Sequence, residues 1–111
     1  MVPDFNKPAF SFVTLCSIRF NSASEGGHSG PIQSDYRCQF RYLDEDAQQL
    51  HEVRVYFVGQ QSTNGGDEIP VLLAFLDWEK QRGRCQPGTK FELRESSRVT
   101  AKGLVHSVAM R

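Results

Sequence analysis

The chain has 111 residues, 39% of them hydrophobic, and its 13 Lys and Arg residues are balanced by 13 Asp and Glu residues. This length predicts one globular domain that can bury a core without disulfides or metals. The zero formal net charge excludes the overall basic footprint of a general nucleic-acid binder and of a polybasic membrane anchor. Any contact with RNA must therefore come from a local patch.

The sequence lacks the signals of export and of membrane insertion. Its N-terminus has no basic segment followed by an apolar one, and its longest apolar run, residues 70–76, has the length of a strand. The three cysteines, Cys16, Cys38 and Cys85, show no C-x-x-C spacing of the kind that redox and zinc sites use. We expect a cytoplasmic protein with reduced thiols, no membrane contact, and neither a metal nor another cofactor.

The N-terminal part of the sequence predicts a strand between two irregular segments. Residues 1–9 contain two prolines and are expected to be extended. In residues 10–20 the even-numbered positions are mostly apolar or aromatic, and this alternation is typical of a strand. Residues 21–35 are rich in Ser, Gly and Pro and predict a long loop.

Alternation also predicts the next three strands. Residues 36–43 have one aromatic and apolar face and one basic and polar face, as expected for a second strand. An acidic turn and a short helical turn at residues 47–50 precede a third strand at residues 53–57. A polar turn at residues 60–67 contains Asn-Gly and leads to a fourth, well-buried strand at residues 70–78.

The C-terminal part predicts a basic turn and a hairpin. Residues 81–88 contain two glycines and a Pro-Gly dipeptide, which indicate a turn. Residues 91–94 and 98–105 alternate as the two arms of the hairpin. Six strands with no helix of ten residues predict an all-β fold, and a closed barrel over residues 10–108 is the form that leaves no exposed edges.

Two segments resemble a known family. Residues 26–40 (GGHSGPIQSDYRCQF) resemble part of the third, C-terminal domain of elongation factor Tu, in which a Gly-Gly-rich loop ends in a proline and is followed by Tyr-Arg-Pro-Gln-Phe. Residues 91–105 (FELRESSRVTAKGLV) are similar to the last hairpin of that domain, with its pattern Phe-x-Ile-Arg-Glu-Gly-Gly-Arg-Thr-Val-x-x-Gly-Val-Val. The motifs occur in the same order, and the resemblance covers nearly the whole chain.

The resemblance implies a six-stranded antiparallel Greek-key barrel that acts as a non-catalytic, translation-related binding module. Its implied partners are RNA, either transfer or ribosomal RNA, or a protein of the translation machinery. The chain has no G-x-x-x-x-G-K-[ST] phosphate loop and no room for a GTPase domain, so no nucleotide is expected as a ligand. The sequence does not indicate an oligomeric state.

The sequence departs from the family pattern at several positions, and three of them replace a proline or glycine of the family. Cys38 stands where the family has a proline, and Ser96 and Ser97 replace both glycines of the family's Glu-Gly-Gly-Arg turn. In the family, that glycine turn allows the backbone to approach the T-stem of transfer RNA. Serine side chains at the turn put this particular contact in question.

The candidate binding residues are the polar ones of the two motifs. The rigid barrel would present the loop at residues 25–31 and the turn at residues 94–98 to its partner. The candidates are His28, Arg37, Gln39, Arg94, Glu95, Arg98 and Lys102. The competing interpretation is a solvated surface whose ion pairs contribute less than about 1 kcal/mol each.

Two other classes of function stay open at this stage. A protein-interaction, mimicry or immunity-type protein without an RNA role agrees with the neutral net charge and the lost glycine turn. A small hydrolase or thiol enzyme would need a deep pocket with an activated cysteine or histidine. Cys38 and Cys85 are the candidate nucleophiles, and Arg82 and Arg84 lie next to Cys85. No nucleophile is paired with a base in the sequence, and we therefore expect a protein without catalytic activity.

Overall fold

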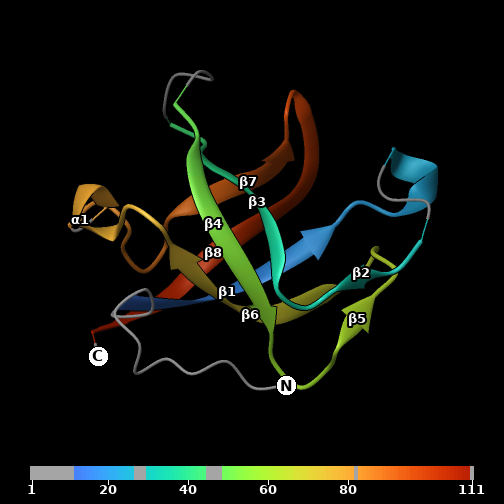
Figure 1. Cartoon of the computed structure of the whole chain (residues 1–111), viewed down its shortest axis with the longest axis horizontal. Helices are drawn as coiled ribbons and strands as arrows, with labels where there is room; N and C mark the ends of the chain where they lie inside the picture. Colours follow the sequence, from blue (N-terminus) through green and yellow to red (C-terminus); the bar gives the residue numbers. More distant parts are fainter. Residues whose placement is uncertain (1–11, 27–29, 45–48, 82, 111) are drawn as a thin grey trace.

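The computed structural model describes residues 12–26, 30–44, 49–81 and 83–110 of the chain (Figure 1). Within them six antiparallel strands form a closed barrel in the order β1-β6-β4-β3-β7-β8. The prediction of a closed, six-stranded antiparallel barrel is therefore confirmed. The strands are β1 (Phe12–Phe20), β3 (Tyr36–Tyr42), β4 (His51–Phe57), β6 (Glu68–Phe75), β7 (Lys90–Glu95) and β8 (Arg98–Met110).

Two segments that were expected to be loops contain a small sheet. β2 (Ile32–Gln33) pairs with β5 (Ser62–Thr63) in two antiparallel strands outside the barrel. The expectation of loops without strands was wrong at these residues, because a two-residue strand is too short to show an alternation in sequence. The short helix η2 (Ala23–Glu25) lies in the first of these segments.

The predicted fourth strand extends too far toward the C-terminus. β6 ends at Phe75, and Trp78 begins the short helix α1 (Trp78–Gln81). The chain turns between Phe75 and Trp78. The Trp78 ring is buried and packs against Phe75 with 6.0 Å between centroids, at the end of the barrel. Trp78 is therefore apolar because it is buried in the helix, although the strand has already ended.

Other expected boundaries are close to the observed ones or fall outside the described residues. β4 begins two positions earlier than predicted, and β8 continues beyond residue 105. The extended segment predicted for residues 1–9, the first two residues of the predicted first strand, and half of the helical turn at residues 47–50 lie outside the described residues.

Aromatic side chains fill the centre of the barrel. The Phe40 ring stacks on Phe91 at 4.5 Å between centroids and meets the rings of Phe75 and Tyr42 edge-on, each at 4.8 Å. These side chains come from β3, β6 and β7, and each is almost completely buried. The rings hold these strands together by burying apolar area and by favourable ring geometry.

Gly103 on β8 makes room for this aromatic packing. It lies opposite Phe91 on β7 and Ile18 on β1. A Cβ atom at position 103 would lie 2.5 Å from Phe91 Cζ and 2.7 Å from Ile18 Cγ2, far inside contact distance. Glycine is therefore required at this position by the space available.

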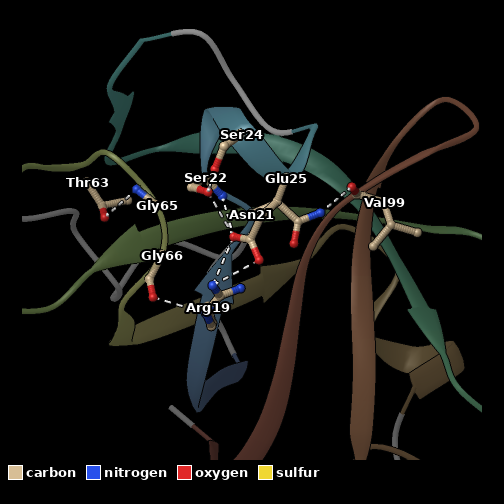
Figure 2. Close-up of polar contacts among 9 residues, drawn as sticks. All are labelled: Arg19, Asn21, Ser22, Ser24, Glu25, Thr63, Gly65, Gly66 and Val99. Carbon is tan, nitrogen blue, oxygen red and sulfur yellow. Dashed lines mark hydrogen bonds and ion pairs between the residues drawn. The ribbon is translucent and has the colours of Figure 1, made fainter.

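The loop that follows β1 is tied to two other parts of the chain (Figure 2). Arg19 donates to the backbone oxygen of Gly66 at 3.0 Å and to the Glu25 carboxylate at 2.9 Å. The Asn21 side chain donates to the backbone oxygen of Val99 at 3.0 Å. These contacts fix the beginning of the Gly-rich segment against the loop before β6 and the beginning of β8.

We predict that Gly103→Ala lowers the free energy of unfolding by about 1–3 kcal/mol, because the added methyl group overpacks the interior beside Phe91. Urea denaturation monitored by circular dichroism measures the change. Gly30→Ala is the matched control, since a Cβ at that position meets nothing within 4 Å. Equal stabilities for the two variants would contradict the tight packing around Gly103.

Candidate functional site

The barrel brings the predicted binding residues of the two sequence motifs together. β7 lies between β3 and β8, so both motifs are part of one continuous sheet. Gln39 pairs with Arg94 across β3 and β7, and Glu95 pairs with Arg98 at the β7–β8 turn. The remaining candidates in the described residues are Arg37 on β3 and Lys102 on β8, while His28 lies outside the described residues.

These three strands are basic although the whole chain is neutral. β3, β7 and β8 together carry six Lys and Arg residues against two Glu residues, whereas the rest of the chain carries seven against eleven. Exposed members of this set include Arg37, Arg98 and Lys102. The fold thus concentrates positive charge on one side of the barrel, which we call the basic face and define as the outer side of β3, β7 and β8.

Glu92 lies within the basic face and is held by two arginines. Its carboxylate accepts from Arg94 Nε at 2.6 Å and lies 3.6 Å from Arg41 Nη1, and the residue is only 7% exposed. A carboxylate this buried needs charged partners, so Arg94 and Arg41 have a structural role in addition to any binding role. Arg41 was not among the predicted site residues, although it shares the polar side of its strand with Arg37 and Gln39.

The turn between β7 and β8 has an unusual backbone. Ser96 has a φ of 59°, in the left-handed region that glycine adopts readily and other residues adopt at a cost. This is one of the two positions at which the resembling family has glycine. The Ser96 N–H donates to the Gln39 side-chain oxygen at 3.3 Å, so a residue of β3 supports the turn.

Glu95 stabilises the same turn through contacts with Tyr36 and Arg98. The Tyr36 hydroxyl donates to the Glu95 carboxylate and lies 3.3 Å from Thr100 Oγ1. Burial, and next the hydrogen bond to Glu95, raise the pKa of Tyr36, which therefore remains a donor at neutral pH. Arg98 Nη2 contacts the other Glu95 oxygen at 3.5 Å, and the hairpin end is held by both contacts.

The first residues of the predicted binding loop are also held in place. Glu25 accepts hydrogen bonds from the Ser22 backbone N–H at 3.0 Å and from Arg19 at 2.9 Å. These donors stabilise the carboxylate and lower the pKa of Glu25 to about 2, with the Ser22 backbone making the largest contribution. The charged form of Glu25 is thus part of the structure of this loop.

The cysteines lie in the interior of the protein. Cys16, Cys38 and Cys85 are between 0% and 7% exposed. Burial raises the pKa of all three thiols, so each is protonated at neutral pH and is a weak nucleophile. Nothing in the described geometry provides the activated thiolate that a thiol enzyme would need.

The described residues contain neither a metal-binding cluster of side chains nor a helix that could span a membrane. No group of three or more His, Cys, Asp or Glu side chains is arranged there to hold a metal ion. In the same residues, neither helix has the length or the apolar content required to cross a lipid bilayer.

Comparison with protein-family models gives no match for this chain, and comparison with curated proteins gives none either. The likeness to the third domain of elongation factor Tu therefore rests on the two sequence motifs described above.

Two substitutions at the hairpin turn should have opposite effects. Ser96→Gly removes the cost of the left-handed backbone and should raise the free energy of unfolding by about 0.5–1 kcal/mol. Ser97→Gly is the matched control; because Ser97 has no positive φ, glycine there should lower stability by about 0.5–1 kcal/mol. Denaturant unfolding of both variants tests the pair, and two effects of the same sign would argue against the turn conformation.

The Glu25 carboxyl offers a second test, by carboxyl-carbon NMR titration. We expect a pKa of about 2 in the native protein, and a higher value in Arg19→Gln because one of its donors is lost. Since the pKa of Glu25 in the folded protein lies below the ordinary 4.5, these contacts stabilise the protein above about pH 4.5. That contribution is lost as the pH falls toward 2.

Ser24→Ala provides the control for the titration, because the Ser24 hydroxyl contacts Ser22 at 3.1 Å rather than the carboxylate. It should leave the pKa of Glu25 nearly unchanged. An ordinary Glu25 pKa in the native protein would contradict the hydrogen bonding described for this loop.

Proposed function

We propose that the protein is a non-catalytic RNA-binding module resembling the third domain of elongation factor Tu, and that the basic face is its binding surface. The observation that carries the proposal is the concentration of cations on β3, β7 and β8 in a chain of zero net charge. The two sequence motifs that resemble the family meet on this face, one on β3 and the other on β7 and β8.

The order of the strands supports the proposed family architecture. β3, β4 and β6 follow one another in sequence and lie side by side, and β1 lies beside β6. In a Greek key, a fourth strand lies beside the first of three consecutive antiparallel strands. Here β1, which comes earlier in the chain, lies beside the last of the three, and this reversed arrangement supports the proposed Greek-key architecture. On this reading the hairpin of β7 and β8 completes the barrel between β3 and β1.

The contact would be made mainly with RNA phosphates. Arg37, Arg98 and Lys102 are exposed on the basic face and can reach a ligand without breaking a buried ion pair. Gln39 supports the turn and is half-buried, and Arg94 neutralises Glu92, so these two residues would mainly position the others. A small patch of this kind predicts modest affinity that depends strongly on salt.

A specific observation favours a second candidate, a protein-binding module. On the opposite side of the barrel, Leu15 on β1 is 37% exposed and lies opposite the half-buried Leu72 of β6. Leu76, just beyond β6, is 63% exposed. Such apolar surface fits a protein partner better than RNA, in line with an interaction or mimicry role.

Fluorescence anisotropy with labelled transfer RNA and with a labelled single-stranded oligonucleotide tests the proposal over a series of salt concentrations. The triple variant Arg37→Gln, Arg98→Gln and Lys102→Gln should lose most of the affinity at low salt. The slope of log affinity against log salt should fall by roughly 2, as expected when about three phosphate contacts are removed.

Single substitutions of two exposed lysines provide the matched control. Lys102→Gln should weaken binding, whereas Lys80→Gln on α1 removes the same charge outside the basic face and should have little effect. Equal affinities of the triple variant and the wild type would overturn the RNA proposal. A single protein that is captured from extract after nuclease treatment and lost on Leu76→Glu would favour the second candidate instead.

A further inference from the structure

A buried polar network joins four side chains at the end of the barrel where β3 ends and β4 begins. Tyr42 is the last residue of β3, His51 the first of β4, Gln81 the last of α1, and Asp77 lies directly before α1. Gln81 is fully buried, Tyr42 is 2% exposed, and the His51 side chain is 11% exposed. Polar groups buried in this way depend on one another for their hydrogen bonds, so a change of charge on one of them affects the rest.

The Gln81 amide determines which groups of the network donate. Its Nε2 donates to Asp77 Oδ2 at 3.2 Å, and its Oε1 accepts from the Tyr42 hydroxyl at 2.8 Å. Because an ionised carboxylate only accepts, the contact with Asp77 defines the orientation of the amide. The same Nε2 contacts His51 Nδ1 at 3.0 Å. His51 Nδ1 is therefore an acceptor, and the neutral imidazole carries its proton on its other nitrogen.

The Asp77 carboxylate is only partly satisfied by these contacts. Its Oδ1 is buried, and none of the described residues donates to it. Its Oδ2 lies 3.6 Å from His51 Nδ1, which is too far for a hydrogen bond but close enough for an ion pair. A carboxylate at this distance favours the charged form of an imidazole. Asp77 is thus placed to receive His51 when that ring takes up a proton.

The charges around His51 come from three elements. Asp77 adjoins α1, the Tyr42 ring of β3 has its centroid 5.7 Å from that of the His51 ring, and Arg84, after α1, lies over the Tyr42 ring at 4.3 Å. Histidine is the side chain among these that ordinarily changes its charge between pH 5 and pH 8. The other charged residues of α1 and the next residue of β4 are exposed; they are Glu79, Lys80 and Glu52.

We propose that His51, Gln81 and Asp77 form a pH-sensitive switch, in which protonation of His51 replaces its hydrogen bond with Gln81 by a direct ion pair with Asp77. A protonated Nδ1 is a donor, and it then faces the donating Nε2 of Gln81, so that hydrogen bond is lost. The Gln81 backbone oxygen accepts from the N–H groups of Arg84 and Cys85, each at 3.0 Å. A displacement of Gln81 therefore loosens the loop that follows α1. This inference does not depend on the proposed function.

NMR of the wild-type protein between pH 8 and pH 5.5 tests the switch. The His51 ring signals and the Gln81 side-chain amide signals should change with one common midpoint, because one proton governs both. The hydrogen-exchange protection factor of the Cys85 N–H should be roughly tenfold lower at pH 5.5 than at pH 7.5, since its acceptor on Gln81 moves. A His51 ring that stays neutral down to pH 5.5, or that titrates while the Cys85 protection factor is constant, would reject the switch.

Two pairs of matched substitutions assign the effect to the network. His51→Gln keeps an acceptor but takes up no proton, so Cys85 protection should no longer depend on pH; His106→Gln, at an exposed position of β8, should behave as the wild type. Asp77→Asn removes the anion and should move the midpoint to lower pH, whereas Asp67→Asn, at the other end of β6, should leave it in place. A loss of protection that persists in His51→Gln, or an unchanged midpoint in Asp77→Asn, would overturn the inference.

Discussion

The packing of aromatic rings around Phe40 is the constraint on which the rest of the structure depends. The interior of a small barrel is filled by side chains, and here Phe40, Phe91 and Phe75 occupy its centre. Gly103 is needed because any larger residue would collide with Phe91 and Ile18. Because these side chains fill the centre of the barrel, the surface proposed for binding lies on the outside of the strands.

Barrel closure also decides which charges meet. Cations that are far apart in sequence become neighbours because β7 pairs with both β3 and β8, and the acidic residues are left mostly on other segments. Within the basic face, Glu92 contacts Arg41 and Arg94, while Arg37 and Lys102 are exposed at the surface. A net charge of zero therefore excludes a uniformly basic surface but is compatible with a basic face.

The sequence was sufficient to predict the barrel because its six strands are long enough for alternation to be visible. The alternation in β1, with Cys16, Ile18 and Phe20 inward, is an example. It could not predict that the apolar run leaves the strand at Leu76, because burial of Trp78 in a helical turn gives the same pattern as burial in a strand. Nor could it predict the contact of Arg84 with Tyr42, because that contact depends on how a loop folds over the end of the barrel.

The two ends of β7 carry different side chains at the surface, and this difference matters for the ligand proposed above. At one end the Ser96 backbone and the Glu95 brace hold a hairpin turn with an exposed Arg98; at the other end Tyr42 supports the Arg84 plane beside Lys90. The six residues of β7, at about 3.3 Å each, separate these features by roughly 17–20 Å. A mononucleotide is too short to engage both ends, so the RNA ligand proposed above would use the whole face only as a chain with repeated negative charges.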